Sequence, residues 1–228
     1  MADLRKKVLG TVSGAVGDIL FRAKNGRNYV GTRPLSFTPG TDEKSVARRK
    51  RFGMATRLAR PINSIYRLKS LWKAVAPVPL HSYNMIVRAN YNSVGPDSIS
   101  NTIKLVPEIG YSVQFSEFTL NVNRMRVALD GLTSASGINP SVEIYCQLVG
   151  IIHLSNPVDT EKEPHVFIPV VSIEQALALN IEITDDIIFQ DVISQLLAMY
   201  QDRKAFLTLL TLDTDRNVIH YSNTFFNN

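Results

Sequence analysis

The sequence predicts an α+β fold, in which a basic N-terminal β-hairpin and helices precede an antiparallel β-sandwich-like domain. Three observations support this class. An Asn-Gly pair separates two alternating segments within 10–34, helix-spaced apolar residues recur between 41 and 75, and about eight strand-like segments follow residue 100. The stretch APVPL at 76–80 is the best boundary. We therefore expect a basic hairpin-plus-helix module over 1–75 and a mildly acidic, mainly antiparallel β domain over 76–228.

The hairpin is predicted from the segment GDILFRAKNGRNYVGTRP, residues 17–34. Its Asn-Gly pair favours a two-residue type I′ turn, because both central residues of that turn need positive φ. This turn sets three cross-strand pairs on one mostly apolar face: Phe21 with Val30, Ala23 with Asn28, and Ile19 with Thr32. An isolated hairpin is marginally stable in water, so this face needs a partner. The opposite face carries the first candidate binding residues: Arg22, Lys24, Arg27, Tyr29 and Arg33.

A helix is predicted from the segment TDEKSVARRKRFGMATRLARP, residues 41–61. Thr41 is the expected N-cap, and the two acidic residues after it favour the positive end of the helix dipole. Pro61 is expected to end or kink the helix near Arg60, because proline lacks a backbone N–H. The first half is charged all round, so it should project into solvent or onto a partner. The basic candidates here are Arg48, Arg49, Lys50, Arg51, Arg57 and Arg60.

Two shorter helices and a series of strands complete the expected fold. Residues 62–75 carry a wide apolar stripe and predict a second helix, and residues 81–95 predict a short third one. The later segments are rich in Val, Ile, Thr and aromatic residues, and turn residues separate them. Residues 186–201 could form a helix among these strands. The strands are expected at 102–107, 112–123, 124–130, 141–155, 165–173, 180–186, 204–214 and 217–226.

Charge is distributed unequally along the chain. Residues 1–75 hold 17 Lys/Arg and 4 Asp/Glu, a net charge of +13, whereas residues 76–228 hold 8 and 16, a net charge of −8. This asymmetry indicates a basic module for a polyanion or an acidic partner, joined to an acidic body. The alternative is that the two parts neutralise each other, within one fold or between subunits.

The sequence contains no recognisable catalytic motif. The glycines of GTVSGAVG at 10–17 lack dinucleotide-binding spacing, and no P-loop, nucleophile elbow or HExxH occurs. The single Cys146 excludes an internal disulfide and is expected to be a small buried hydrophobe. An enzyme site would require folding to gather His153, His165 and His220, and we expect scatter instead. We therefore predict that the protein is not an enzyme and has no catalytic residue, cofactor or metal site.

The segment GAVGDILFRAKNGRNYVGTRP, followed by SVARRKRFGMATRLARPI, resembles an uncharacterised domain family of Bacteroidota and their phages. Members begin with a Gly-Val-Gly hairpin, continue into an Arg/Gln-rich helix with an early Phe, and end in a β domain. The segment TLDTDRNVIHYSNTFF would be the closing hairpin of that domain. The match is specific over residues 10–62, where TDEKSVARRK replaces the glutamines expected before the arginine run. The resemblance implies no activity, cofactor or catalytic residue, and it implies a mobile-element or virion context.

Together these observations predict a non-enzymatic structural protein of a larger assembly, such as a phage virion or related particle. We expect it in the virion or in the cytoplasm. Its basic module would dock on other protein subunits, of the same or another kind, or on packaged nucleic acid. The alternative is a sequence-nonspecific DNA- or RNA-binding protein that holds the phosphate backbone with the same arginines. No membrane partner is expected, since no window holds eighteen consecutive apolar residues.

Overall fold

The computed structural model describes residues 2–3, 13–24, 27–33, 36 and 38–227 and has the predicted α+β composition. The chain separates into two compact units, Met1–Val46 and Ala47–Asn228. The boundary expected near residue 75 therefore lies inside the second unit, because the helices before it share a hydrophobic core with the strands after it. In the described residues, no helix is both long and apolar enough to cross a membrane.

The N-terminal unit contains, in its described residues, a four-stranded antiparallel sheet in the order β1-β4-β3-β2. The strands are β1 (Ala2–Asp3), β2 (Gly14–Val16), β3 (Ile19–Lys24) and β4 (Arg27–Thr32). Strand β3 pairs with β4 in the predicted register, with Phe21 opposite Val30. This register confirms the hairpin, although its Asn25-Gly26 turn lies outside the described residues. Strand β2 adds a second hairpin through Gly17, whose φ of 55° favours glycine.

Helix α1 (Glu43–Ser64) begins and ends later than the sequence predicts. Its N-cap is Asp42 rather than Thr41, since the Asp42 carboxylate accepts a hydrogen bond of 3.0 Å from the backbone N–H of Ser45. Pro61 does not end the helix, which continues for three more residues. Proline costs about 3 kcal/mol inside a helix, and we attribute its tolerance here to the complete burial of the residues around it: Leu58, Ala59 and Ile62.

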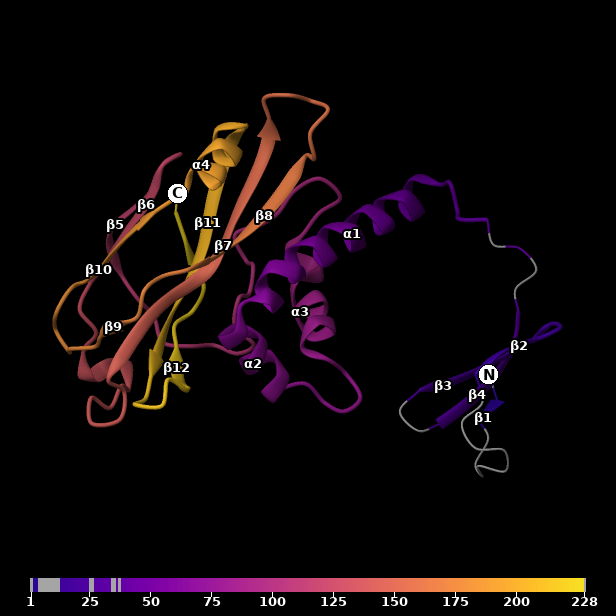
Figure 1. The fold of residues 1–228 in the computed structure, drawn as a ribbon, viewed down its shortest axis with the longest axis horizontal. Helices are drawn as coiled ribbons and strands as arrows, with labels where there is room; N and C mark the ends of the chain where they lie inside the picture. Colours follow the sequence, from indigo (N-terminus) through magenta and orange to yellow (C-terminus); the bar gives the residue numbers. More distant parts are fainter. Residues whose placement is uncertain (1, 4–12, 25–26, 34–35, 37, 228) are drawn as a thin grey trace. The chain divides into compact units, whose positions relative to one another are not determined.

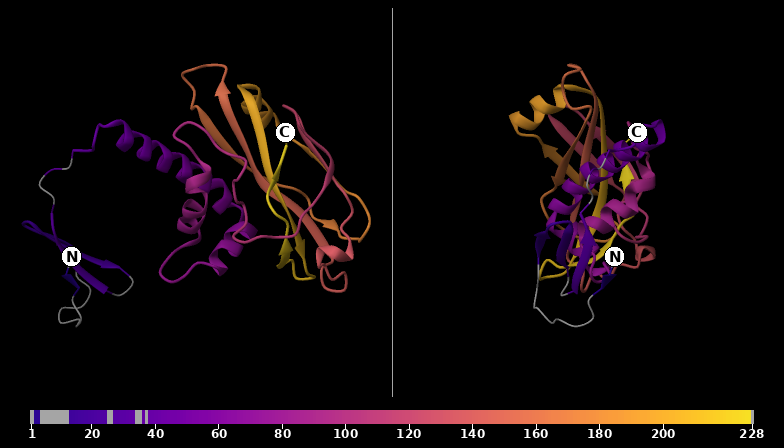
Figure 2. Two further views of the ribbon diagram at one scale, coloured as in Figure 1. Left: turned by 180° about the vertical axis from the view of Figure 1, so that it is seen from behind. Right: turned by 90° about the vertical axis from the view of Figure 1, so that its right-hand side faces the viewer.

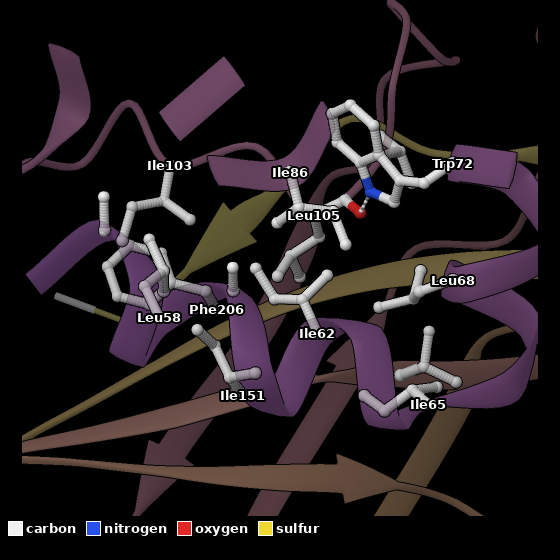
Figure 3. Close-up of a cluster of buried hydrophobic side chains, with 14 of the residues drawn as sticks. Leu58, Ile62, Ile65, Leu68, Trp72, Ile86, Ile103, Leu105, Ile151 and Phe206 are labelled. Carbon is white, nitrogen blue, oxygen red and sulfur yellow. Dashed lines mark hydrogen bonds between the residues drawn. The ribbon is translucent and has the colours of Figure 1, made fainter. Parts of the chain in front are cut away.

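Two short helices follow α1 and pack with it. Helix α2 (Tyr66–Ala74) begins after Ile65, whose extended backbone separates it from α1. Helix α3 (Ser82–Asn90) confirms the predicted third helix and runs into the 3-10 turn η1 (Tyr91–Ser93). Figure 3 shows the core that these helices share with the β-strands. In it, the Trp72 indole donates a hydrogen bond of 2.8 Å to the carbonyl of Leu105.

Residues 102–107 were expected to be a strand, and this prediction is wrong. The segment has no regular structure, yet Ile103 and Leu105 are buried in the helical core. The side chain of the fully buried Asn90 forms hydrogen bonds with the backbone of this segment, in place of a neighbouring strand. The Asn90 amide accepts a bond of 2.7 Å from the Lys104 N–H and donates one of 2.9 Å to the Lys104 carbonyl. The alternating pattern therefore reflects burial without strand pairing.

The second unit contains two antiparallel sheets. The larger is built on a pair of long strands, β7 (Tyr145–Pro157) and β11 (Tyr200–Leu212). Its shorter members are β8 (His165–Val171), β9 (Gln175–Ala176), β12 (Val218–Tyr221) and β13 (Phe225–Phe226). The smaller sheet has the order β10-β6-β5, with β5 (Phe115–Leu120), β6 (Arg124–Leu129) and β10 (Ile183–Ile188). A short turn η2 (Ser134–Ser136) and helix α4 (Asp191–Ala198) lie in the connections.

These elements form three layers, with the β7–β11 pair in the middle (Figure 1 and Figure 2). In β7, Val149 and Ile151 point to the helices α1–α3, whereas Leu148 and Ile152 point to the three-stranded sheet. Both faces of the central strands are therefore buried. This explains why their sequences are nearly continuous apolar runs rather than the alternating pattern of a half-exposed strand.

Candidate functional site

The eleven predicted binding residues belong to two different units. Five lie on the N-terminal sheet, where Arg22 stands opposite Tyr29 on the strand pair β3–β4. Arg22, Arg27 and Arg33 are exposed and Tyr29 is half-buried. The backbone of Lys24 pairs with Arg27, but its side chain is not among those described. The sequence thus placed the cationic face of this hairpin correctly.

Among the described residues of this unit, the other face of the sheet is apolar and only partly buried. The strand register places five apolar residues on it, namely Val16, Ile19, Phe21, Ala23 and Val30. None of them is buried, and Val16 and Ile19 are 70% and 45% exposed. Among the described residues of this unit, Asn28 alone is buried. The described part of this sheet therefore has no hydrophobic core of its own.

The six predicted residues on α1 belong to the second unit, and several of them contact its acidic part. Lys50 lies 3.3 Å from the Asp97 carboxylate and Arg57 lies 2.8 Å from that of Glu163. The Arg51 guanidinium lies 5.6 Å from the ring centroid of Tyr91. Part of the charge asymmetry is therefore neutralised within the fold, as the alternative interpretation of the sequence allows. Exposed ion pairs of this kind contribute about 0–1 kcal/mol each.

Three further cations of α1 lie at the surface of the helix. Residues 47–75 contain nine Lys/Arg and no Asp/Glu. Arg48, Arg49 and Arg60 are exposed, and Arg60 makes no ion pair with any residue that the structure describes. The helix therefore keeps a positive surface beside its ion pairs.

An aromatic groove between α1 and α3 lies beside these cations. It is a cavity of about 410 Å³ whose walls include Phe52, Tyr83, Val87, Arg88 and Tyr91. Phe52 is 57% exposed, and no carboxylate is among the described residues that line the groove. Of the lining residues, the sequence pattern pointed only to Phe52, the early Phe of the arginine-rich helix. The spacing of Tyr83, Val87 and Tyr91, four residues apart along α3 and η1, is the signal that could have revealed the second wall.

A second group that the sequence did not single out joins α2 to the sheet. The Arg67 guanidinium lies 2.6 Å from the Glu174 carboxylate and also donates to the side-chain oxygen of Gln147. Arg216 contacts the other oxygen of Glu174 at 3.1 Å and lies over the ring of Tyr145. The hydrogen bond from Arg67 is the main cause of the lowered pKa of Glu174. This network is internally satisfied and has a structural role.

Two of the three histidines that an enzyme site would have to gather do come together. The Nε2 atom of His153, on β7, lies 3.0 Å from Nδ1 of His165, at the start of β8. Both line a cavity of about 730 Å³ that also includes Lys204. The third histidine, His220, lies on β12 and contacts the fully buried carboxylate of Glu143 at 3.1 Å. The expectation that the three histidines lie apart is therefore wrong for His153 and His165 and right for His220.

The histidine pair is uncharged at neutral pH. Burial is the main cause that lowers the pKa of His153 to about 3, with further contributions from His165 and Lys204, and burial also lowers the pKa of His165. Among the described residues, no hydroxyl or thiol is hydrogen-bonded to either imidazole, so the nucleophile–base contact of a hydrolase is missing there. The described residues also contain no group of three His, Cys, Asp or Glu side chains placed to hold a metal ion.

Comparison of the chain with protein-family models, with curated proteins and with solved structures finds no match in any of the three.

Proposed function

We propose that the protein is a non-enzymatic structural component of a larger assembly, such as a phage virion or related particle. One observation carries this proposal: among the described residues, the apolar side chains on one face of the N-terminal sheet are half-buried or exposed. Complete burial of a Val, Ile or Phe side chain contributes about 1.5–3 kcal/mol. A face that includes Val16, Ile19 and Phe21 therefore gains several kcal/mol when another surface covers it.

The partner that we propose for this face is a second copy of the same chain. The first 75 residues carry a net charge of +13 and the remainder carries −8, so the two parts of different copies attract each other. Lys50 and Arg57 already contact Asp97 and Glu163 within one chain, so cation–carboxylate pairing between these parts is compatible with the fold. The cationic face that carries Arg22 and Arg27 would face acidic side chains of the neighbouring copy.

The resemblance of residues 10–62 to a domain family of Bacteroidota and their phages supports the particle context. That family implies no catalytic activity, which agrees with a docking role for the basic module. A head-to-tail contact between identical chains produces a ring or an extended array, and such arrays are the basis of virion shells and fibres.

The mass of the full-length protein in solution, measured by light scattering over a range of concentrations, tests this proposal. We expect species larger than the 25.4 kDa chain and a monomer for the double variant Phe21→Glu/Val30→Glu. Ile173→Glu, which changes an exposed apolar residue of the second unit, is the matched control and should assemble normally. A wild-type protein that stays monomeric at every concentration would refute self-assembly.

A second candidate function is sequence-nonspecific binding of the nucleic-acid backbone by the same arginines. The observation that favours it is the run of nine cations without a carboxylate over residues 47–75. Binding through several phosphates releases counterions, so the affinity for random DNA should fall steeply as salt increases. An affinity that hardly changes with salt would exclude this candidate without affecting the first.

A further inference from the structure

We infer that the groove between α1 and α3 is a binding site for an unpaired base of a single-stranded nucleic acid. This inference deepens the second candidate function from a contact with phosphates to a site for a base. It does not involve the N-terminal sheet, so it is independent of self-assembly. The shape, the rigidity and the chemistry of the groove support a base as the ligand.

The groove is of suitable size and offers aromatic surface. Its volume of about 410 Å³ lies in the range of about 300–1,000 Å³ that is usual for small-ligand sites. Phe52 contributes one wall from α1, and Tyr83 and Tyr91 contribute the other from α3 and η1. An aromatic ring has a π-face on which a base of any sequence can stack.

The walls of the groove are held in place before any ligand binds. The Tyr83 hydroxyl donates a hydrogen bond of 3.1 Å to the carbonyl of Thr56, which links α3 to α1 across the groove. The Ser82 hydroxyl donates a second one, of 2.7 Å, to the side chain of Asn63. Ile86, on the opposite side of α3, is fully buried in the core. A preformed site loses little conformational entropy on binding.

Phe52 is exposed although it lies beside the buried residues of α1. Its neighbours Met54 and Ala55 are buried, whereas Phe52 is 57% exposed. Arg48 and Arg49 precede it by one helical turn and therefore lie on the same side of α1. An exposed aromatic ring beside cations suits a ligand that combines a flat apolar part with negative charge.

The polar groups of the groove distinguish a nucleotide from an acidic polypeptide. Among the described residues that line it, Arg88 is the only charged one and Val87 the only aliphatic one, and Asn84 and Asn92 supply amide groups. Amides can donate to and accept from the edge of a base. Acidic peptide motifs are usually bound by clusters of Arg side chains, whereas the described residues that line the groove include one Arg, Arg88. A base in a duplex is already stacked, so the occupant must be single-stranded.

Fluorescence anisotropy with labelled single-stranded oligonucleotides of about 12 nucleotides and the full-length protein tests this inference. Wild-type protein should bind the single strand more tightly than a duplex of the same length. Phe52→Ala should weaken binding to the single strand about tenfold, within the range expected for loss of one stacked base. The matched control is Tyr66→Ala, since Tyr66 is an exposed aromatic residue of α2 outside the groove, and its affinity should equal that of the wild type. Phe52→Trp should retain binding.

The salt dependence of the same variants separates the base site from contacts with phosphates. Phe52→Ala should leave the slope of log affinity against log salt unchanged, whereas Arg88→Ala should reduce it by about one. If Phe52→Ala binds as tightly as Tyr66→Ala while the slope stays steep, the base site is refuted and backbone binding stands. If no oligonucleotide binds, the base site and backbone binding are both refuted, and the proposal of self-assembly is unaffected. If poly-glutamate displaces the oligonucleotide at equal charge concentration, the occupant is an acidic polypeptide and the inference is wrong.

Discussion

The Nε2 atom of His153 lies 3.0 Å from Nδ1 of His165, and the two rings are nearly parallel, with an interplanar angle of 13°. Phe167 also stacks on His153, with ring centroids 4.8 Å apart. A proton shared between two neutral imidazoles satisfies both nitrogens, so the pair can remain buried without a counter-charge. Protonating both would place two like charges in contact.

This pair should make the stability of the protein depend on pH. The pKa of His153 is lowered from 6.5 to about 3 in the fold, so the unfolded chain binds the proton more tightly. The contribution of neutral His153 to the free energy of unfolding is fully present above pH 6.5 and is lost as the pH falls from 6.5 towards 3. At about pH 4.5 the loss should approach about 3 kcal/mol. Urea unfolding at several pH values measures it, and His153→Phe should flatten the dependence. If the stability of the wild type and of His153→Phe depends equally on pH, His153 is not the cause of the dependence.

Gly150 and Gly53 should respond to alanine in opposite directions. A Cβ atom at Gly150 would stand 2.0 Å from the Phe206 carbonyl oxygen, which belongs to the backbone of the paired strand. Gly150→Ala must therefore separate β7 from β11 and should destabilise the protein by about 3 kcal/mol or more. A Cβ at Gly53, inside α1, meets nothing within 4 Å, so Gly53→Ala should stabilise by about 0.5–1 kcal/mol. Thermal melting of the two variants checks both, and equal shifts would contradict the packing described.

Asn90→Ala should be strongly destabilising for a polar substitution. Its side chain makes three hydrogen bonds, two with the backbone of Lys104 and one, of 3.1 Å, with the carbonyl of Ile86. Alanine leaves buried backbone groups without partners, at a cost of about 3 kcal/mol in the free energy of unfolding. The control is Asn84→Ala, at an exposed position of the same helix, which should change it by less than about 0.5 kcal/mol. If urea titrations give similar losses of stability for Asn90→Ala and Asn84→Ala, water replaces the hydrogen bonds of Asn90.

Arg67→Ala should weaken the attachment of α2 to the sheet. It removes the contact with Glu174 and leaves the nearly buried Gln147 side chain with one partner fewer. We expect a loss of about 2 kcal/mol in the free energy of unfolding. Lys69→Ala, at an exposed cation of the same helix, should have almost no effect. A loss shared by both variants would point to helix propensity rather than to the arginine network.

The elements that the sequence predicted best are those set by local chemistry. The pairing of Phe21 with Val30 followed from the Asn-Gly spacing alone, and the cationic face of the hairpin followed from that register. The errors arose where tertiary packing overrides a local signal. Pro61 stays helical amid buried neighbours. Ile103 and Leu105 are buried without a strand partner, and the Asn90 side chain bonds the backbone of Lys104 between them. The packing of α3 beside α1, which forms the groove, and the His153–His165 contact depend on chain crossings that residue spacing does not reveal.

The burial of β7 and β11 on both faces also determines where the chain can be shortened. Val149, Ile151 and Phe206 lie against helices that come from before residue 75. A fragment beginning at residue 76 would expose these side chains to water as a continuous apolar surface and should aggregate on expression. Truncation near Ala47 keeps that helical cover and is the choice for crystallisation or binding work on this unit.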